Sequence, residues 1–181
     1  MISVLTAFLA TWDNARATLG AGTPVDGSRF DMGARLEQFH DTMLGTVAGE
    51  QWTGSAAEAY TDRNQRLAGT IGRLAELDRR LGAEVDRSAD VVAAGRRDLD
   101  AVKQWVLSAA ATVPPNAAGE RALMTVVSKG VADIAEIVQR SNSDMAGIAN
   151  RIRDIGTGYE ALAGDAPATA VRQEPPRRAG R

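Results

Sequence analysis

The chain has 181 residues, of which 44% are hydrophobic and 24% are charged, a balance typical of an ordered protein rather than a disordered polymer. Its 21 basic and 23 acidic residues nearly cancel, so the charge pattern argues against nucleic-acid binding. The absence of cysteine excludes disulfides, thiol nucleophiles and cysteine-ligated metal centres. With only 3 Trp, 2 Tyr and 3 Phe, any core depends on aliphatic side chains, which suits slender helices.

The first expected element is a short amphipathic helix over about residues 2–19. This apolar opening has no Lys or Arg before it, whereas a Sec leader needs a positive segment ahead of its apolar run. We therefore expect no Sec signal peptide. The best candidate for a membrane span, residues 104–119, is interrupted by Pro114-Pro115 and polar groups, so we expect a soluble chain.

The second expected helix covers about residues 29–48. Ser28 followed three positions later by Asp31 resembles a helix start, in which both side chains bond free amide groups. The residues expected to be buried are Leu36, Phe39, Met43 and Val47.

Two long helices are expected next, over about residues 55–112 and 119–163. Ser55 and Glu58 have the spacing of a capping box at the start of the first of these. Apolar residues then recur at alternating steps of four and three, which predicts a coiled-coil seam on each helix. The seam positions are Leu67, Ile71, Leu74, Asp78, Leu81, Val85, Ser88, Val92, Gly95, Leu99, Val102 and Val106, then Val127, Val131, Ile134, Val138, Ser141, Met145, Ile148, Ile152, Ile155, Tyr159 and Leu162.

Pro114-Pro115 must end the first long helix, because proline lacks the amide donor and clashes with the preceding turn. A short connection then predicts an antiparallel hairpin in which positions whose numbers add up to about 231 lie level. Ser88 is accordingly expected beside Ser141 or Ser143. Asp78 is expected beside Arg151 or Arg153.

These elements predict an all-α, elongated antiparallel helical hairpin or bundle of about four helices. We expect residues 1–163 to form one helical domain. Residues 164–181 are rich in Pro, Gly and Arg and lack apolar periodicity, so we expect a disordered tail.

The sequence contains no recognisable catalytic or nucleotide-binding pattern. His40, with Glu37 and Asp41 beside it, is a candidate metal ligand, but a lone histidine on such a helix is more often a surface group. We therefore expect a protein that is not an enzyme, with no cofactor, no metal and no small-molecule substrate.

The run Trp52-Thr53-Gly54 lies in the turn before the first long helix, where Trp can cover apolar surface and Gly lets the backbone reverse. The string continues through Ser55, Glu58 and Tyr60, and residues 28–112 resemble the EspA/EspE group of mycobacterial secretion-associated proteins within the WXG superfamily. The resemblance implies a non-enzymatic type VII (ESX-type) secretion substrate or secretion-associated protein, located outside the cell or in the cell envelope. It places Trp52, Gly54 and Tyr60 in the recognition surface.

Substrates of type VII systems usually carry a Tyr-x-x-x-Asp/Glu signal on one member of a helical pair. Here Tyr60 is followed four residues later by Asn64, and Tyr159 by Ala163, so the resemblance implies that a partner supplies the signal. The expected partners are a second helical hairpin or another copy of this chain, together with the secretion machinery.

Two alternatives remain open from the sequence. The end of the long arm near Trp52 and Tyr60 is covered either by a partner or by the earlier helices of the same chain, and exposed apolar surface there would indicate a binding site. The functional alternative to secretion is a cytoplasmic coiled-coil adaptor or structural protein, in which the Trp-x-Gly turn is only architecture.

Overall fold

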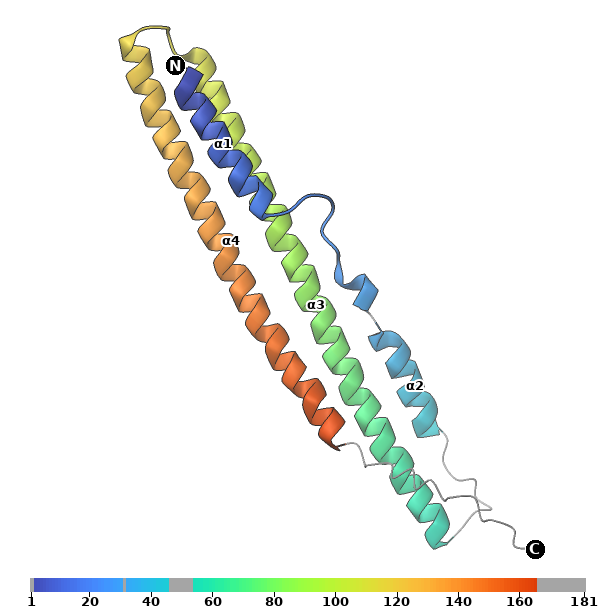
Figure 1. The fold of residues 1–181 in the computed structure, drawn as a ribbon. Coiled ribbons are helices and arrows are strands. Elements are labelled where there is room, and N and C mark those ends of the chain that lie inside the picture. Colours follow the sequence, from blue (N-terminus) through green and yellow to red (C-terminus); the bar gives the residue numbers. More distant parts are fainter. Residues whose placement is uncertain (1, 31, 46–53, 166–181) are drawn as a thin grey trace, which may run out of the picture.

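A computed structural model describes residues 2–30, 32–45 and 54–165 as an elongated arrangement of helices (Figure 1). No strand occurs in these ranges, and the all-α prediction is confirmed. The elements are α1 (Ile2–Thr18), the 3-10 turn η1 (Gly27–Phe30), α2 (Gly33–Gly45), α3 (Ser55–Thr112) and α4 (Ala117–Asp165).

The two longest helices, α3 and α4, run antiparallel along the whole molecule (Figure 1). Their 58 and 49 residues correspond to rods of about 87 and 74 Å at about 1.5 Å per residue. Helix α1 lies beside both rods near the proline turn, whereas α2 packs on α3 towards the other end. The hairpin prediction is therefore confirmed.

The return helix starts two residues earlier than expected. Val113 is extended after α3, and the Asn116 side-chain oxygen accepts hydrogen bonds from the amides of Ala118 (3.1 Å) and Gly119 (2.9 Å). This side-chain cap satisfies amides that have no partner within the helix, so α4 begins at Ala117. Gly119 is required here because a Cβ would lie 1.9 Å from the Pro114 carbonyl oxygen.

The prediction for residues 29–48 is only partly right. Ser28 lies in η1, where its amide and hydroxyl both donate to Asp26 Oδ1, at 3.1 and 2.5 Å. The helix starts at Gly33 because Asp78 of α3 accepts a hydrogen bond from the Met32 amide (2.7 Å), and the Met32 carbonyl accepts one from Leu36. A carboxylate 46 residues away thus sets the boundary.

The expected apolar face of α2 is also only partly right. Leu36 and Met43 are half-buried, but Phe39 is 53% exposed. Val47 lies outside the described residues. The helix has only α3 to pack against among the described elements, so fewer of its apolar residues are buried than the sequence predicted.

The predicted capping box on α3 is wrong. Gly54 occupies the N-cap position with φ 104° and ψ 179°, and no side-chain hydrogen bond caps the helix. The Gly54 carbonyl accepts from the amides of Ala57 (3.0 Å) and Glu58 (3.1 Å), which makes Ser55 the first helical residue. A positive φ of this size favours glycine, so backbone geometry rather than the Ser55 hydroxyl determines this start.

The core between α3 and α4 confirms half of the predicted α4 seam and shifts the other half by one position. Val127, Ile134, Ser141, Ile148 and Ile155 are buried as expected. At three of the alternate positions the residue one place earlier packs against α3 or α1, namely Gly130, Ile137 and Gly158. The apolar residues that the pattern assigned to these positions remain exposed, namely Val131, Met145 and Ile152.

The predicted register is wrong by about one helical turn. The Ser88 hydroxyl donates to Met145 Sδ at 3.7 Å instead of lying beside Ser141 or Ser143. Arg151 pairs with Glu84 rather than Asp78, and Arg153 donates to Asn150 of its own helix. The reason is the extended segment after Thr112, which carries the start of α4 further along the bundle before the chain turns back.

The predicted tail begins within α4, because Gly164 and Asp165 are its last two helical residues. The rest of the predicted tail, from residue 166, lies outside the described part of the chain.

Candidate interaction surface

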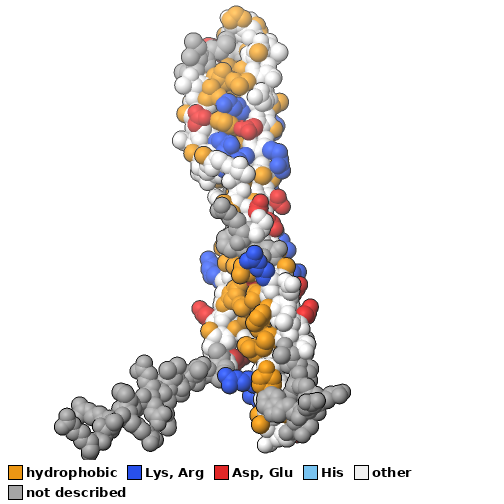
Figure 2. Space-filling view, turned by 90° about the vertical axis from the view of Figure 1, so that its right-hand side faces the viewer, with side chains coloured by type: hydrophobic (Ala, Val, Ile, Leu, Met, Phe, Trp, Pro, Cys, Tyr) orange, Lys and Arg blue, Asp and Glu red, His pale blue; other side chains and the backbone are white. Residues whose placement is uncertain are grey.

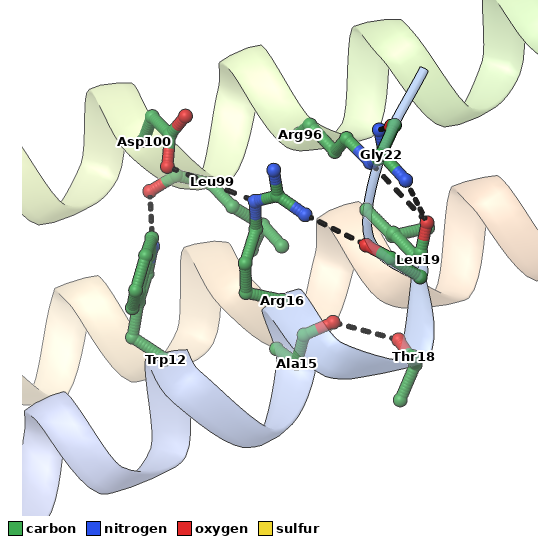
Figure 3. A network of polar contacts seen from close by, with 10 residues as sticks. Trp12, Ala15, Arg16, Thr18, Leu19, Gly22, Arg96, Leu99 and Asp100 are labelled. Carbon is green, nitrogen blue, oxygen red and sulfur yellow. Dashed lines mark hydrogen bonds and ion pairs between the residues drawn. The ribbon is translucent and has the colours of Figure 1, made fainter. Parts of the chain in front are cut away.

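Helix α1 is fixed to the rods by its aromatic residues (Figure 3). Phe8 is 1% exposed and belongs to the same core cluster as Leu99 of α3. The Trp12 indole nitrogen donates to the Leu99 carbonyl oxygen at 2.7 Å, and the Lys103 ammonium lies 3.6 Å from the centre of the Trp12 ring. These contacts bury the apolar side of α1 and satisfy its one polar aromatic atom.

The end of α1 is held by a single arginine of α3. Arg96 donates to the Leu19 carbonyl oxygen through two nitrogens, at 3.2 and 2.8 Å, and to the Gly22 carbonyl oxygen. In Figure 3 its guanidinium reaches across to the turn that leaves α1. A planar fork with five donors can bond several carbonyls at once, so this side chain fixes the turn.

The segment from η1 to α2 is held by two carboxylates of α3. Asp86 accepts from the Gly27 amide (2.7 Å), and Asp78 accepts from Met32 as described above. Further along, the His40 ring lies against Gly72, and its Nδ1 is 3.2 Å from Asp41 Oδ1. His40 therefore packs on α3, which is a structural role. No group of three potential metal ligands occurs within residues 2–30, 32–45 and 54–165.

A polar layer joins α3 and α4 in the middle of the hairpin. Glu84 is only 5% exposed and accepts a hydrogen bond from Arg151 of α4 (2.9 Å) and another from Arg87 of its own helix. Further towards the proline turn, Arg140 pairs with Asp98 at 2.6 Å. Breaking a buried pair leaves an uncompensated charge, so this layer opposes sliding of one rod along the other.

α3 extends beyond the end of α4 and is only partly covered there, since Ala68 and Ala57 are still 1% and 7% exposed. α4 finishes at Asp165, whose carboxylate is 3.7 Å from the Arg73 guanidinium. Beyond this point the first predicted seam residue, Leu67, is 46% exposed, and Tyr60 one heptad earlier is 38% exposed. The cis coverage by α2 that the sequence left open is therefore incomplete.

We name this region the open end, defined by three exposed apolar residues of α2 and α3: Phe39, Tyr60 and Leu67. Figure 2 shows hydrophobic side chains gathered in a column on the lower half of the molecule, over α2 and the neighbouring part of α3. Apolar surface concentrated at one end of a helical rod is typical of a protein interaction site.

A groove of about 520 Å³ lies next to this region, between α2, α3 and the last turns of α4. Its walls include His40, Gly72, Leu77, Gly158 and Leu162. A Cβ on Gly158 would lie 2.8 Å from the Leu77 side chain, so the glycine allows the rods to approach closely here. The groove suits apolar or helical contacts better than charged ligands.

Tyr159 gives this part of the hairpin a pH dependence. Partial burial, and then the negative charge of Asp78, raise the pKa of the Tyr159 phenol. The unfolded chain therefore releases this proton first, near pH ~10, and stability should fall as the pH rises through that range. We expect Tyr159→Phe to lose less stability than the natural chain between pH 8 and 10.5 in urea unfolding. Equal losses in the two proteins would contradict this assignment.

The structure reaches only some of the residues that the sequence assigned to recognition. Trp52 lies outside the described residues. Gly54 provides the left-handed turn into α3, Tyr60 is exposed five residues into the helix, and Glu58 stands in its first turn, where its charge favours the N-terminal end. Sequence reasoning missed Arg96 and Asp86, because charged residues on a long helix normally face solvent, and it assigned Asp78 to the seam with α4 instead of to the contact with Met32.

No helix within the described ranges is both long enough and apolar enough to span a bilayer. Residues 19–101, which run from the end of α1 to the middle of α3, match the EspA/EspE family. This segment is similar to the EspA/EspE family. The predicted resemblance to this group is confirmed, and the matched segment contains η1, α2, the open end and the turn at Gly54.

The curated relatives are much longer than this chain. The ESX-1 secretion-associated protein EspE of Mycolicibacterium smegmatis is 28% identical over 167 residues, which cover 86% of this chain and 31% of that protein. The ESX-1 secretion-associated protein EspE of Mycobacterium tuberculosis CDC 1551 is 34% identical over 91 residues, which cover 49% of this chain and 22% of its own length. This chain thus spans less than a third of either relative. No solved structure matches it.

Proposed function

We propose that this chain is a non-enzymatic, secretion-associated protein of an ESX-type system that acts by binding another helical protein through its open end. The relationship to the two EspE proteins supports the secretion-associated role. The single observation that carries the binding role is the exposure of the large apolar residues Leu67 and Tyr60 on α3, beyond the end of α4. Trp52 and Gly54 border this surface in the sequence and belong to the proposed recognition site.

The chemistry of the open end fits an amphipathic helix. A heptad stripe on a helix is covered most effectively by another apolar stripe, because side chains then interlock along both elements. Phe39 extends the apolar area sideways onto α2. The partner therefore supplies the helix that α4 would have supplied if it were longer.

The role of the open end is tested with Leu67→Gln and Tyr60→Gln in the full chain. Both side chains are exposed, so we expect unfolding free energies within about 0.5 kcal/mol of the natural chain. The chain is co-expressed with each helical protein encoded beside its gene and purified through an affinity tag. The variants should retain at least tenfold less of the protein that the natural chain retains.

Met124→Gln is the matched control, because Met124 is 53% exposed on α4 near the proline turn, far from the open end. It should retain the partner at the level of the natural chain. Equal loss in all three variants would contradict a specific role of the open end. Failure of the natural chain to retain any neighbouring protein, together with its absence from culture filtrate, would contradict the proposed function itself.

Trp52→Ala separates recognition from architecture. If Trp52 is part of the recognition surface, the variant should keep its helical thermal unfolding curve and lose export into the culture filtrate. Loss of the helical signal at the growth temperature would instead favour the alternative of a coiled-coil adaptor, in which this turn only holds the helices together.

A further inference from the structure

We propose that two copies of this chain associate through the lower part of α4, antiparallel to each other about a two-fold axis beside Gly156. This inference does not depend on the proposed partner at the open end and uses different residues. The surface, which we call the α4 face, consists of Ala149, Arg153, Gly156, Glu160 and Ala163. These positions alternate in steps of four and three and therefore share one side of the helix.

The α4 face continues a surface that already binds a helix. Near the proline turn, Val4, Phe8 and Thr11 of α1 line a groove with α4, and Ser128 lies on its α4 wall. Steps of seven residues lead from Ser128 to Ala149, Gly156 and Ala163, so the same side of α4 extends below α1. Helix α1 ends at Thr18, and the Leu19 side chain that follows it lies against Gly95, close to the Ser141 hydroxyl.

Below this level the α4 face has no cover within the described chain. Among the described elements α4 contacts only α3 and α1, while α2 lies on the other side of α3 (Figure 1). Apolar residues beside the face remain exposed, with Met145 and Ile152 each at 36%. The heptad pattern assigned both residues to a helix interface. Their spacing therefore suits packing against another helix, but no described helix covers them.

The face is complementary to itself. In an antiparallel pair centred at Gly156, Arg153 of one copy lies opposite Glu160 of the other, and the two-fold axis produces this ion pair twice. Ala149 lies opposite Ala163 in the same register. Neither Arg153 nor Glu160 forms an ion pair with another described residue, and Arg153 donates only to Asn150 on its own helix.

The centre of the face allows two backbones to approach closely. A Cβ on Gly156 would meet nothing within 4 Å, whereas the half-buried Gly158 faces Leu77. Gly156 is therefore not needed for packing within the chain, and the open space beside its Cα suits a close helix contact. A second copy of this chain matches these observations. In an antiparallel pair, small residues lie opposite small residues, and each Arg153 lies opposite a Glu160.

The ion pairs are tested by charge reversal in the full chain. Sedimentation velocity over a range of concentrations should show a reversible dimer. Arg153→Glu and Glu160→Arg should each raise the dimer dissociation constant at least tenfold, because each places like charges opposite each other at both symmetric contacts. The double variant R153E/E160R should return the constant to within about threefold of the natural value. A variant that merely misfolds would not be rescued in this way.

The position of the axis is tested by cysteine substitution, which is clean because the chain has no cysteine. Under mild oxidation Gly156→Cys should form a covalent dimer, since a residue beside the axis meets its own copy. Gln139→Cys, exposed on the same helix but outside the face, should stay largely monomeric. A monomer at all concentrations would overturn the proposal, as would charge reversals without effect or equal crosslinking at both cysteines. The co-expression experiment on the open end tests the proposed function and does not affect this conclusion.

Discussion

Phe8→Ala is expected to destabilise the protein by about 3–5 kcal/mol, the largest effect we anticipate for a single substitution. Phe8 is 1% exposed, and its ring faces Gly130, whose absent side chain leaves room for it. Removing the ring leaves a cavity among Leu99, Val106 and the α1 residues, and stiff rods cannot collapse to fill it. Urea unfolding followed by circular dichroism at 222 nm measures the loss.

Phe39→Ala is the matched control, because it removes the same side chain from a position that is 53% exposed. We expect its unfolding free energy to remain within about 0.5 kcal/mol of the natural value. If the two substitutions cost the same, Phe8 does not anchor α1 as the structure describes. A loss confined to proteolytic release of α1, with an unchanged midpoint, would mean that the rods are stable without it.

Gly27→Ala is expected to destabilise the protein and Gly82→Ala is not, although the two glycines lie on the two sides of one contact. A Cβ on Gly27 would lie 2.2 Å from the Gly82 carbonyl oxygen, so η1 would have to move away and weaken the hydrogen bond from Gly27 to Asp86. We expect a loss of about 1–3 kcal/mol, in line with overpacking elsewhere.

At Gly82 the added Cβ would lie 3.6 Å from the Gly27 carbonyl oxygen, which is ordinary contact. This residue is inside α3, where alanine favours the helix over glycine by up to about 1 kcal/mol. Gly82→Ala should therefore be neutral or stabilising. Thermal unfolding of both variants decides the point, and a stabilising Gly27→Ala would show that η1 does not lie against α3.

The two pairs test the same feature of the architecture. α1 and the segment from η1 to α2 are short elements whose placement depends on buried aromatic rings, close glycine contacts and carboxylates of α3. Rods held by a long seam tolerate small defects, whereas a short helix with few contacts does not.

The two long helices and the antiparallel hairpin could be predicted from residue order alone. A long apolar repeat separated by Pro114-Pro115 allows few other solutions, because each stripe must be covered and the connection is short. The string around Trp52 and Tyr60 was sufficient to indicate the EspA/EspE resemblance, which the match over residues 19–101 confirms.

The heptad pattern did not distinguish neighbouring positions on α4. Glycine and alanine carry almost no hydrophobic signal, so Gly130 and Gly158 were not recognised as core positions, and Val131 and Ile152 were assigned to the seam instead. For the same reason, the pattern did not indicate that one side of α4 has no cover among the described helices. The register between α3 and α4 differed from the predicted one because the sequence does not show how far the proline connection reaches. That distance depends on its extended backbone.

Local periodicity and turn residues thus determined that this protein is a long antiparallel helical hairpin with shorter helices before it. The tertiary structure decided where the short helices start and which apolar residues stay exposed. These features depend on residues far apart in sequence, such as the bond from Met32 to Asp78 and the two carbonyls that Arg96 holds. Sequence periodicity reports which residues prefer burial, but only the packed chain shows how much of that surface its own helices can cover.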